Sequence, residues 1–154
     1  MPYEIEVTAT AACSPETVFK HLAVPEAWSE WGRFPARARQ ARQGDEQRYG
    51  VGSVKKVPPV REETVVFDPP FHFAYVALSG MPVRNYRSDV RLEERDGATF
   101  IRWQAVFDPL IPGTGPFLRV GLRLMLAAFV RWLSQHVKRC DASCASRQLL
   151  IPAP

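Results

Sequence analysis

The chain has 154 residues, of which 46% are hydrophobic and 23% are charged, and its formal net charge is +4 at pH 7. This length and composition indicate one globular domain with one core, and they exclude a largely disordered chain. The net positive charge is small, and few aromatic residues lie among the basic ones. The sequence therefore does not indicate a nucleic-acid partner, and we expect none.

The cysteines and the N-terminus indicate the compartment. The three cysteines are Cys13, Cys140 and Cys144, and no signal-peptide pattern precedes them. An odd number of cysteines without such a signal favours a reduced, cytoplasmic protein. The most apolar stretch, residues 117–133, contains three arginines, which argues against a membrane-spanning helix.

The chain begins with a strand and two short helices. Alternating apolar residues over 3–9 predict a half-buried strand. Ser14 can cap a helix that starts at Pro15, because proline suits a first helical turn. A second short helix carries Trp28 and Trp31 on one side. The expected buried residues of the first helix are Val18, Phe19 and Leu22.

Residues 36–108 predict six antiparallel strands, separated by glycine and proline turns. The predicted strands are 36–42, 53–57, 61–67, 72–78, 84–93 and 99–108. Asp96-Gly97 joins the last two as a hairpin, because glycine tolerates the positive φ of a tight turn.

Alternation assigns the side chains of the last three strands to two faces. We expect Phe73 and Tyr75 to face inward, because aromatic side chains bury the most area. The opposite face of the next strand, with Arg87, Asp89 and Arg91, is expected to be solvated and to carry cross-strand ion pairs. The inward residues expected of the hairpin are Tyr86, Ser88, Val90, Leu92, Ile101, Trp103, Ala105 and Phe107.

Residues 115–146 predict one long amphipathic helix. Its apolar stripe consists of Leu118, Leu122, Met125, Leu126, Phe129, Leu133 and Val137. The expected fold is therefore α+β: an antiparallel six- to seven-stranded sheet curled around one long C-terminal helix, with two short helices after the first strand. We expect a single domain over residues 1–148 and a frayed tail over 149–154.

Several strings resemble the START-related helix-grip superfamily, in particular its polyketide cyclase/dehydrase and lipid-transport (SRPBCC) branch. They are SPETVFKHLAVPEAWSEW (14–31), VGSVKK (51–56), FDPPFHFAY (67–75), VRNYRSDVRLEERDGATFIRW (83–103) and FDPLIPGTGP (107–116). The resemblance implies the helix-grip fold, and a pocket between the sheet and the last helix is a physical expectation of that architecture. It supplies no shared catalytic motif, because this fold hosts many functions.

The main functional hypothesis is a carrier or sensor that binds a small hydrophobic ligand (a lipid, polyketide or aromatic metabolite) without a cofactor. The expected ligand-binding residues are Tyr75, Tyr86, Ser88, Val90, Trp103, Phe107, Met125 and Phe129. The expected gate of the cavity consists of Trp28, Trp31, Pro112, Gly113 and Gly115.

Two alternatives stay open: an enzyme of the polyketide cyclase/dehydratase type, and a filled domain with a protein-interaction role. Transient contact with a membrane surface and a monomeric or homodimeric state are further expectations.

Histidines and cysteines are the remaining candidates for chemistry. A catalytic base could be His21, His72 or His136, but the sequence singles out none of them. His21 suits a surface position at the end of a helix, and His72 suits a position at the start of a strand, near the rim of the pocket. His136, Cys140 and Cys144 stand at i, i+4 and i+8 of the predicted last helix, where two of them could share a metal ion. We expect polar or small residues on a helix flank there, and no metal site.

Overall fold

The structure is a computed structural model that describes residues 2–139 and 143–151. The strands are β1 (Tyr3–Ala11), β2 (Arg39–Arg42), β3 (Val54–Val57), β4 (Val60–Asp68), β5 (His72–Ser79), β6 (Val83–Arg95) and β7 (Ala98–Pro109). The helices are α1 (Pro15–Ala23), η1 (Pro25–Ala27), α2 (Trp28–Trp31), α3 (Gly115–Val137) and η2 (Ala145–Gln148).

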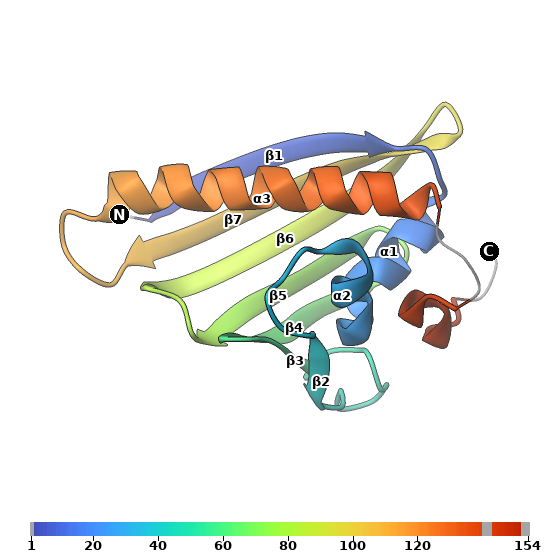
Figure 1. Ribbon diagram of the computed structural model, residues 1–154, viewed down its shortest axis with the longest axis horizontal. Coiled ribbons are helices and arrows are strands. Elements are labelled where there is room, and N and C mark those ends of the chain that lie inside the picture. The colour runs from blue at the N-terminus through green and yellow to red at the C-terminus, as the bar shows by residue number, and fades with distance from the viewer. Residues whose placement is uncertain (1, 140–142, 152–154) are drawn as a thin grey trace.

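The strands form one antiparallel sheet in the order β1-β7-β6-β5-β4-β3-β2, and α3 lies across one face of it (Figure 1). The predicted α+β helix-grip fold is therefore confirmed. None of the described helices is long and apolar enough to cross a membrane.

The two short helices form where the sequence predicts them. The Ser14 hydroxyl accepts a hydrogen bond from the Thr17 amide at 3.3 Å, so it caps α1. The indoles of Trp28 and Trp31 donate hydrogen bonds to backbone carbonyls near the end of α1, those of Leu22 (2.9 Å) and His21 (3.0 Å). These two bonds fix α2 against α1 and hold both rings in the core.

The strand faces also agree with the alternation. Phe73 and Tyr75 are both 1% exposed. On the β6–β7 hairpin, Ser88 pairs with Ala105 and Val90 with Trp103. All of these side chains are buried, so the inward face is assigned correctly by sequence.

Helix α3 packs mainly on β1 and makes smaller contacts with β7 and α2. The predicted helix end at residue 146 is wrong, because α3 ends at Val137 and Ala145–Gln148 form the separate turn η2. Val137 is the last buried residue of the apolar stripe, and Lys138 and Arg139 after it are exposed.

The C-terminal segment lies partly against the domain. Leu149 and Ile151 are half-buried and pack on the core, whereas Leu150 is exposed. Cys140 lies outside the described residues, as do the other members of 140–142 and 152–154.

Candidate functional site

An apolar cavity of 220 Å³ lies between α3 and the β3–β5 side of the sheet. Its walls come from α2 and the loop after it, the β3–β4 hairpin, β5, β6 and α3. The lining residues are Trp28, Phe34, Pro35, Val57, Pro58, Pro59, Val60, Glu62, Tyr75, Met81, Tyr86, Met125 and Phe129. Such an apolar hollow with a few convergent polar groups is the usual form of a small-molecule site.

The predicted ligand-binding residues divide into two groups. Tyr75, Tyr86, Met125 and Phe129 line the cavity. The other four, which are Ser88, Val90, Trp103 and Phe107, are not among its lining residues and are 0% exposed.

The predicted gate residues also lie in different places. Trp28 lines the cavity, whereas Trp31 packs against Trp28 with ring centroids 4.8 Å apart. Pro112 and Gly113 are exposed in the loop between β7 and α3. Gly115 starts α3, where a Cβ atom would clash with the ring of Tyr3. None of these last three is among the lining residues of the cavity.

A buried ion pair, which sequence reasoning did not find, stands at the cavity wall. The Lys55 ammonium lies 3.2 Å from the Glu62 carboxylate, and the two side chains are 5% and 8% exposed. The ammonium also lies 4.0 Å from the ring centroid of Trp28 and 3.9 Å from that of Tyr75, which places it in cation–π contact with both rings.

Burial and attraction act against each other in this pair. Burial lowers the pKa of Lys55 and raises the pKa of Glu62, while the charge and hydrogen bond of each partner oppose those shifts. Glu62 is the only carboxylate that lines the cavity among the described residues. Both groups therefore ionise less readily than they would in water, which is common where a protein binds or moves protons.

A signal for this pair exists in the sequence. Pro58-Pro59 makes a two-residue turn, so Val57 pairs with Val60 and Lys55 with Glu62. Because side chains alternate, Lys55 shares its face with the apolar Val57.

Hydroxyl groups supply the remaining polar atoms near the cavity. The Ser88 hydroxyl donates a hydrogen bond to the Tyr86 hydroxyl at 2.9 Å. Burial raises the pKa of Tyr75 and of Tyr86, so both phenols stay protonated at neutral pH. In the described part of the chain, the indole Nε1 of Trp103 is the one fully buried side-chain nitrogen or oxygen without a hydrogen-bond partner.

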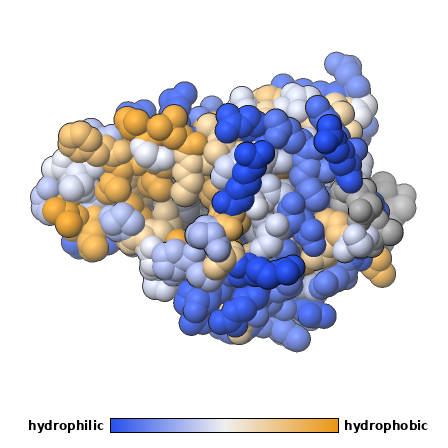
Figure 2. Space-filling model, viewed as in Figure 1, coloured by the Kyte–Doolittle hydropathy of each residue, from blue (hydrophilic) through white to orange (hydrophobic). Residues whose placement is uncertain are grey.

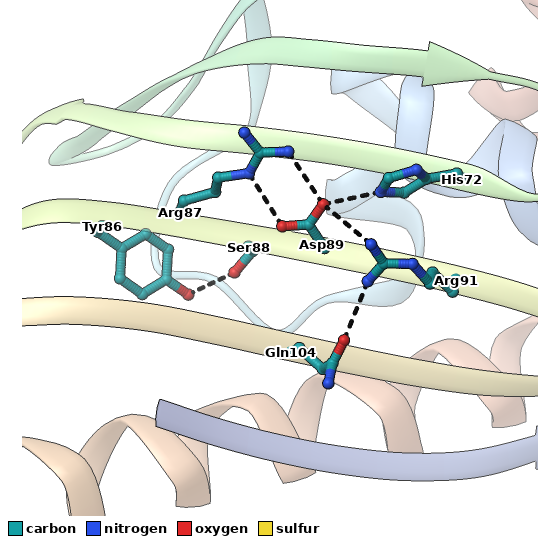
Figure 3. Close-up of polar contacts among 7 residues, drawn as sticks. All are labelled: His72, Tyr86, Arg87, Ser88, Asp89, Arg91 and Gln104. Atoms are coloured by element: carbon teal, nitrogen blue, oxygen red, sulfur yellow. Dashed lines mark hydrogen bonds and ion pairs between the residues drawn. The ribbon is translucent and has the colours of Figure 1, made fainter. Parts of the chain in front are cut away.

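A different polar cluster occupies the outer face of the sheet (Figure 3). Asp89 accepts a hydrogen bond from His72 at 2.7 Å and two from Arg87 at 3.0 and 3.2 Å. Burial opposes ionisation of Asp89, but these hydrogen bonds prevail and lower its pKa. Arg91 donates to Gln104 on the neighbouring strand at 3.0 Å. The outer face thus carries ion pairs as predicted, but the Arg87–Asp89 pair lies within β6, and a cross-strand pair is that of Arg102 on β7 with Glu6 on β1, at 3.6 Å.

The three candidate histidines do not line the cavity. His72 belongs to the outer cluster. The expectation of a surface position for His21 is wrong, because this side chain is 1% exposed. Its Nδ1 bonds to the Thr17 carbonyl at 2.7 Å, and burial lowers its pKa to about 4. The ring of His136 lies beside it, with centroids 5.0 Å apart.

Two wider hollows, of 530 and 580 Å³, lie where α3 runs beside β1. Charged side chains such as Glu6 and Arg123 line both of them. The 220 Å³ cavity is smaller but mainly apolar, so it is the better candidate for a small hydrophobic molecule.

Comparison with known proteins agrees with the fold. Ara h 8.0201 superposes with a TM-score of 0.74 at 17% identity, covering 91% of this chain and 100% of that one. A START superfamily protein from Mycobacterium smegmatis gives 0.73 at 15% identity, covering 88% and 97%. CalU16 from Micromonospora echinospora gives 0.61 at 12% identity, covering 94% and 82%. At these identities the similarity shows the fold alone.

No curated protein matches the sequence. The model of one protein family, described as polyketide cyclase / dehydrase and lipid transport, matches residues 2–139. Because this match spans nearly the whole chain, the protein belongs to the polyketide cyclase / dehydrase and lipid transport family.

Proposed function

We propose that this protein is a carrier or sensor that binds a small, mainly apolar molecule with one polar group in the 220 Å³ cavity. The observation that supports this most is the composition of the wall: apolar and aromatic side chains surround a single carboxylate, Glu62, and two tyrosines. Apolar walls supply the affinity, and a few fixed polar groups orient the ligand.

The size of the cavity narrows the ligand class. Sites for drug-sized molecules measure about 300–1,000 Å³, and this cavity is smaller, at 220 Å³. The aromatic core behind it is closely packed, since Trp103 stands against Trp28 and Phe129 with ring centroids about 6 Å away (6.0 and 5.9 Å). We therefore expect a ligand of one or two rings, or a short acyl chain, rather than a full-length lipid.

Glu62 defines the polar group of the ligand. An ionised carboxylate only accepts hydrogen bonds, so it favours a ligand hydroxyl or amine. The neutral phenols of Tyr75 and Tyr86 can donate or accept. The expected ligand thus carries a hydrogen-bond donor on an otherwise apolar body.

A pair of probes tests this proposal. 2-Naphthol has two rings and one hydroxyl, and naphthalene has the same rings without it. By calorimetry we expect 1:1 binding of 2-naphthol that is at least about 10-fold tighter than that of naphthalene, because a hydrogen bond to a charged group contributes about 1.5–3 kcal/mol.

Two neighbouring residues of α3 provide a test variant and its control. Met125 lines the cavity, whereas Leu124 is 67% exposed. Met125→Trp should fill the cavity and abolish binding, and Leu124→Trp should leave it unchanged. Binding that survives Met125→Trp would place the ligand outside this cavity and contradict the proposal, and no binding to the unaltered protein would support the filled-domain alternative.

The second candidate, an enzyme of the cyclase/dehydratase type, is favoured by the same carboxylate. Burial raises the pKa of Glu62, so its carboxylate binds a proton more readily than a carboxylate in water, which favours a general base. Such a base would remove a proton from a carbon next to a carbonyl, giving an enolate and a protonated Glu62. A bicyclic monoketone such as 2-tetralone, in heavy water, should then exchange its α-protons faster with the unaltered protein than with Glu62→Gln. Equal exchange rates would contradict the enzyme and leave ligand binding as the remaining function.

Ligand exchange at a membrane surface is the third part of the proposal. Exposed apolar residues gather on the first half of α3 and the loop before it, at the left end of Figure 2. They are Leu110, Ile111, Phe117, Val120 and Leu124. Arg119 and Arg123 are exposed on the same helix, so the patch is suited to an anionic lipid surface.

Vesicle co-sedimentation tests this contact. The protein should sediment with phosphatidylserine vesicles more than with phosphatidylcholine vesicles. Phe117→Asp should reduce this binding several-fold, whereas Leu150→Asp, which alters an equally exposed residue (83% against 81%) outside the patch, should not. Equal loss in both variants would contradict a specific docking patch.

A further inference from the structure

Two histidines and one cysteine from three different elements meet where α1, α3 and η2 come together. Cys144 Sγ lies 3.6 Å from His21 Nε2 and 3.5 Å from His136 Nε2. The three potential ligand atoms all lie within 4.8 Å of one another. His21 and Cys144 are buried and His136 is half-buried, so the cluster is largely sheltered from solvent.

The two sulfur–nitrogen distances suit a tetrahedral metal ion. Zinc binds sulfur at about 2.3 Å and imidazole nitrogen at about 2.0 Å, so adjacent sulfur and nitrogen ligands of one tetrahedron lie about 3.5 Å apart. Both sulfur–nitrogen distances in the cluster match this value.

The His21 ring is already oriented as a ligand. A backbone carbonyl only accepts hydrogen bonds, so the 2.7 Å contact with the Thr17 carbonyl requires a proton on His21 Nδ1. The neutral ring then carries its lone pair on Nε2, the atom that faces Cys144. Metal-binding histidines commonly use their other nitrogen in this way.

The cysteine has a supporting contact of its own. The Ser146 hydroxyl donates a hydrogen bond to Cys144 Sγ at 3.3 Å. A donor at this position stabilises the thiolate, which is the form of cysteine that binds metals.

We propose that His21, His136 and Cys144 form a binding site for a zinc-like divalent transition-metal ion. Two imidazoles and a thiolate are a donor set that zinc accepts, and three protein ligands leave a fourth position for water or another ligand. The ion would join η2 to α1 and α3. None of the three ligands lines the 220 Å³ cavity, so this proposal is independent of the proposed function.

The test uses cobalt as a coloured substitute for zinc. Chelator-treated full-length protein is titrated with Co²⁺, and we expect one equivalent to give visible bands of tetrahedral cobalt and a near-ultraviolet thiolate-to-cobalt band. Zn²⁺ should displace the cobalt, appear as one bound ion in native mass spectra and raise the melting temperature.

Variants separate the site from other thiols. Cys144→Ser should abolish the thiolate band, and Cys13→Ser, which alters a cysteine outside the cluster, should retain it. His136→Ala should weaken Co²⁺ binding by more than about 10-fold. Even the mutation of a residue that only supports a metal ligand typically lowers metal affinity by about 10–100-fold. If Cys144→Ser fails to fold, as judged by circular dichroism, His136→Ala decides.

Two results would overturn the proposal. One is the absence of a thiolate-to-cobalt band in the unaltered protein, which would indicate a hydrogen-bonded cluster that binds no metal. The other is a band that survives both Cys144→Ser and His136→Ala, which would place the metal on other residues.

Discussion

Two ion pairs lie on opposite faces of the same sheet. The inner pair joins Lys55 and Glu62 at 3.2 Å, and its side chains are 5% and 8% exposed. The outer pair joins Arg87 and Asp89 at 3.0 Å, and its side chains are 44% and 17% exposed. The distances are similar, so the difference between the two lies in their contact with water.

That difference decides what each group can do. Water screens the outer pair, whose contribution to stability is modest. The inner pair has lost its hydration, which costs several kcal/mol per ion, and its mutual attraction offsets that cost only while both partners are present. A buried pair of this kind contributes little net stability, but it places a carboxylate that accepts hydrogen bonds beside an apolar cavity. We infer that its role is recognition rather than folding.

The largest expected effect comes from removing one inner partner. Glu62→Ala leaves the Lys55 ammonium buried without a counter-ion. We expect the free energy of unfolding to fall by about 3–5 kcal/mol, measured by urea denaturation.

The double variant Lys55→Met/Glu62→Leu is the matched control, because it replaces both charges with apolar groups of similar size. Its free energy of unfolding should lie within about 1 kcal/mol of the unaltered protein, or above it, while the preference for 2-naphthol over naphthalene is lost. A double variant as unstable as Glu62→Ala would show that the pair serves folding after all.

A smaller effect is expected from the hydroxyl pair of the inner face. Tyr86→Phe removes the acceptor of the Ser88 hydroxyl, which is 0% exposed. An unsatisfied buried donor costs about 1–3 kcal/mol, and thermal unfolding should show this loss. The double variant Tyr86→Phe/Ser88→Ala should recover part of the lost stability. If Ser88→Ala instead lowers the stability further, the lost hydrogen bond is not the cause.

Removing an outer partner should matter less. Arg87→Ala should lower the free energy of unfolding by no more than about 1 kcal/mol, since exposed pairs typically contribute 0.2–1 kcal/mol. High salt should shrink even this difference. A loss as large as that of Glu62→Ala would remove the distinction between the two faces.

The smallest expected effect is a dependence on pH. Hydrogen bonds from Arg87 and His72 overcome the effect of burial and hold the pKa of Asp89 below its ordinary value of 3.8. The folded state therefore binds fewer protons here than the unfolded state, so this stabilisation is present above that value and is lost as the pH falls below it. Asp89→Asn should flatten the acid side of the stability curve; an unchanged acid limb would contradict the assignment.

The sequence predicts most of the fold because its signals are local. Period-two alternation assigns Tyr75 and Trp103 to the inner face, and Ser14 with Pro15 marks the start of α1. Both depend only on neighbouring residues, and the structure agrees with both.

The candidate site is predicted less completely because it depends on contacts between distant segments. The turn at Pro58-Pro59 pairs Lys55 with Glu62 locally, but the sequence gives no sign that the distant Trp28 would cover Lys55. Likewise, Cys144 meets His21 across 123 residues of sequence, because the chain after α3 returns to the end of α1. No periodicity within one element encodes that approach.

The most direct test of the central claim uses the methionines. The chain has three, and two of them line the cavity: Met81 from the loop between β5 and β6, and Met125 from α3. With carbon-13 in the methionine methyl groups, each gives its own NMR signal. If the cavity is the binding site, titration with 2-naphthol shifts the signals of Met81 and Met125 together and saturates at one equivalent. If both signals stay unchanged at saturating 2-naphthol, the cavity is not a ligand site and the proposed function is wrong.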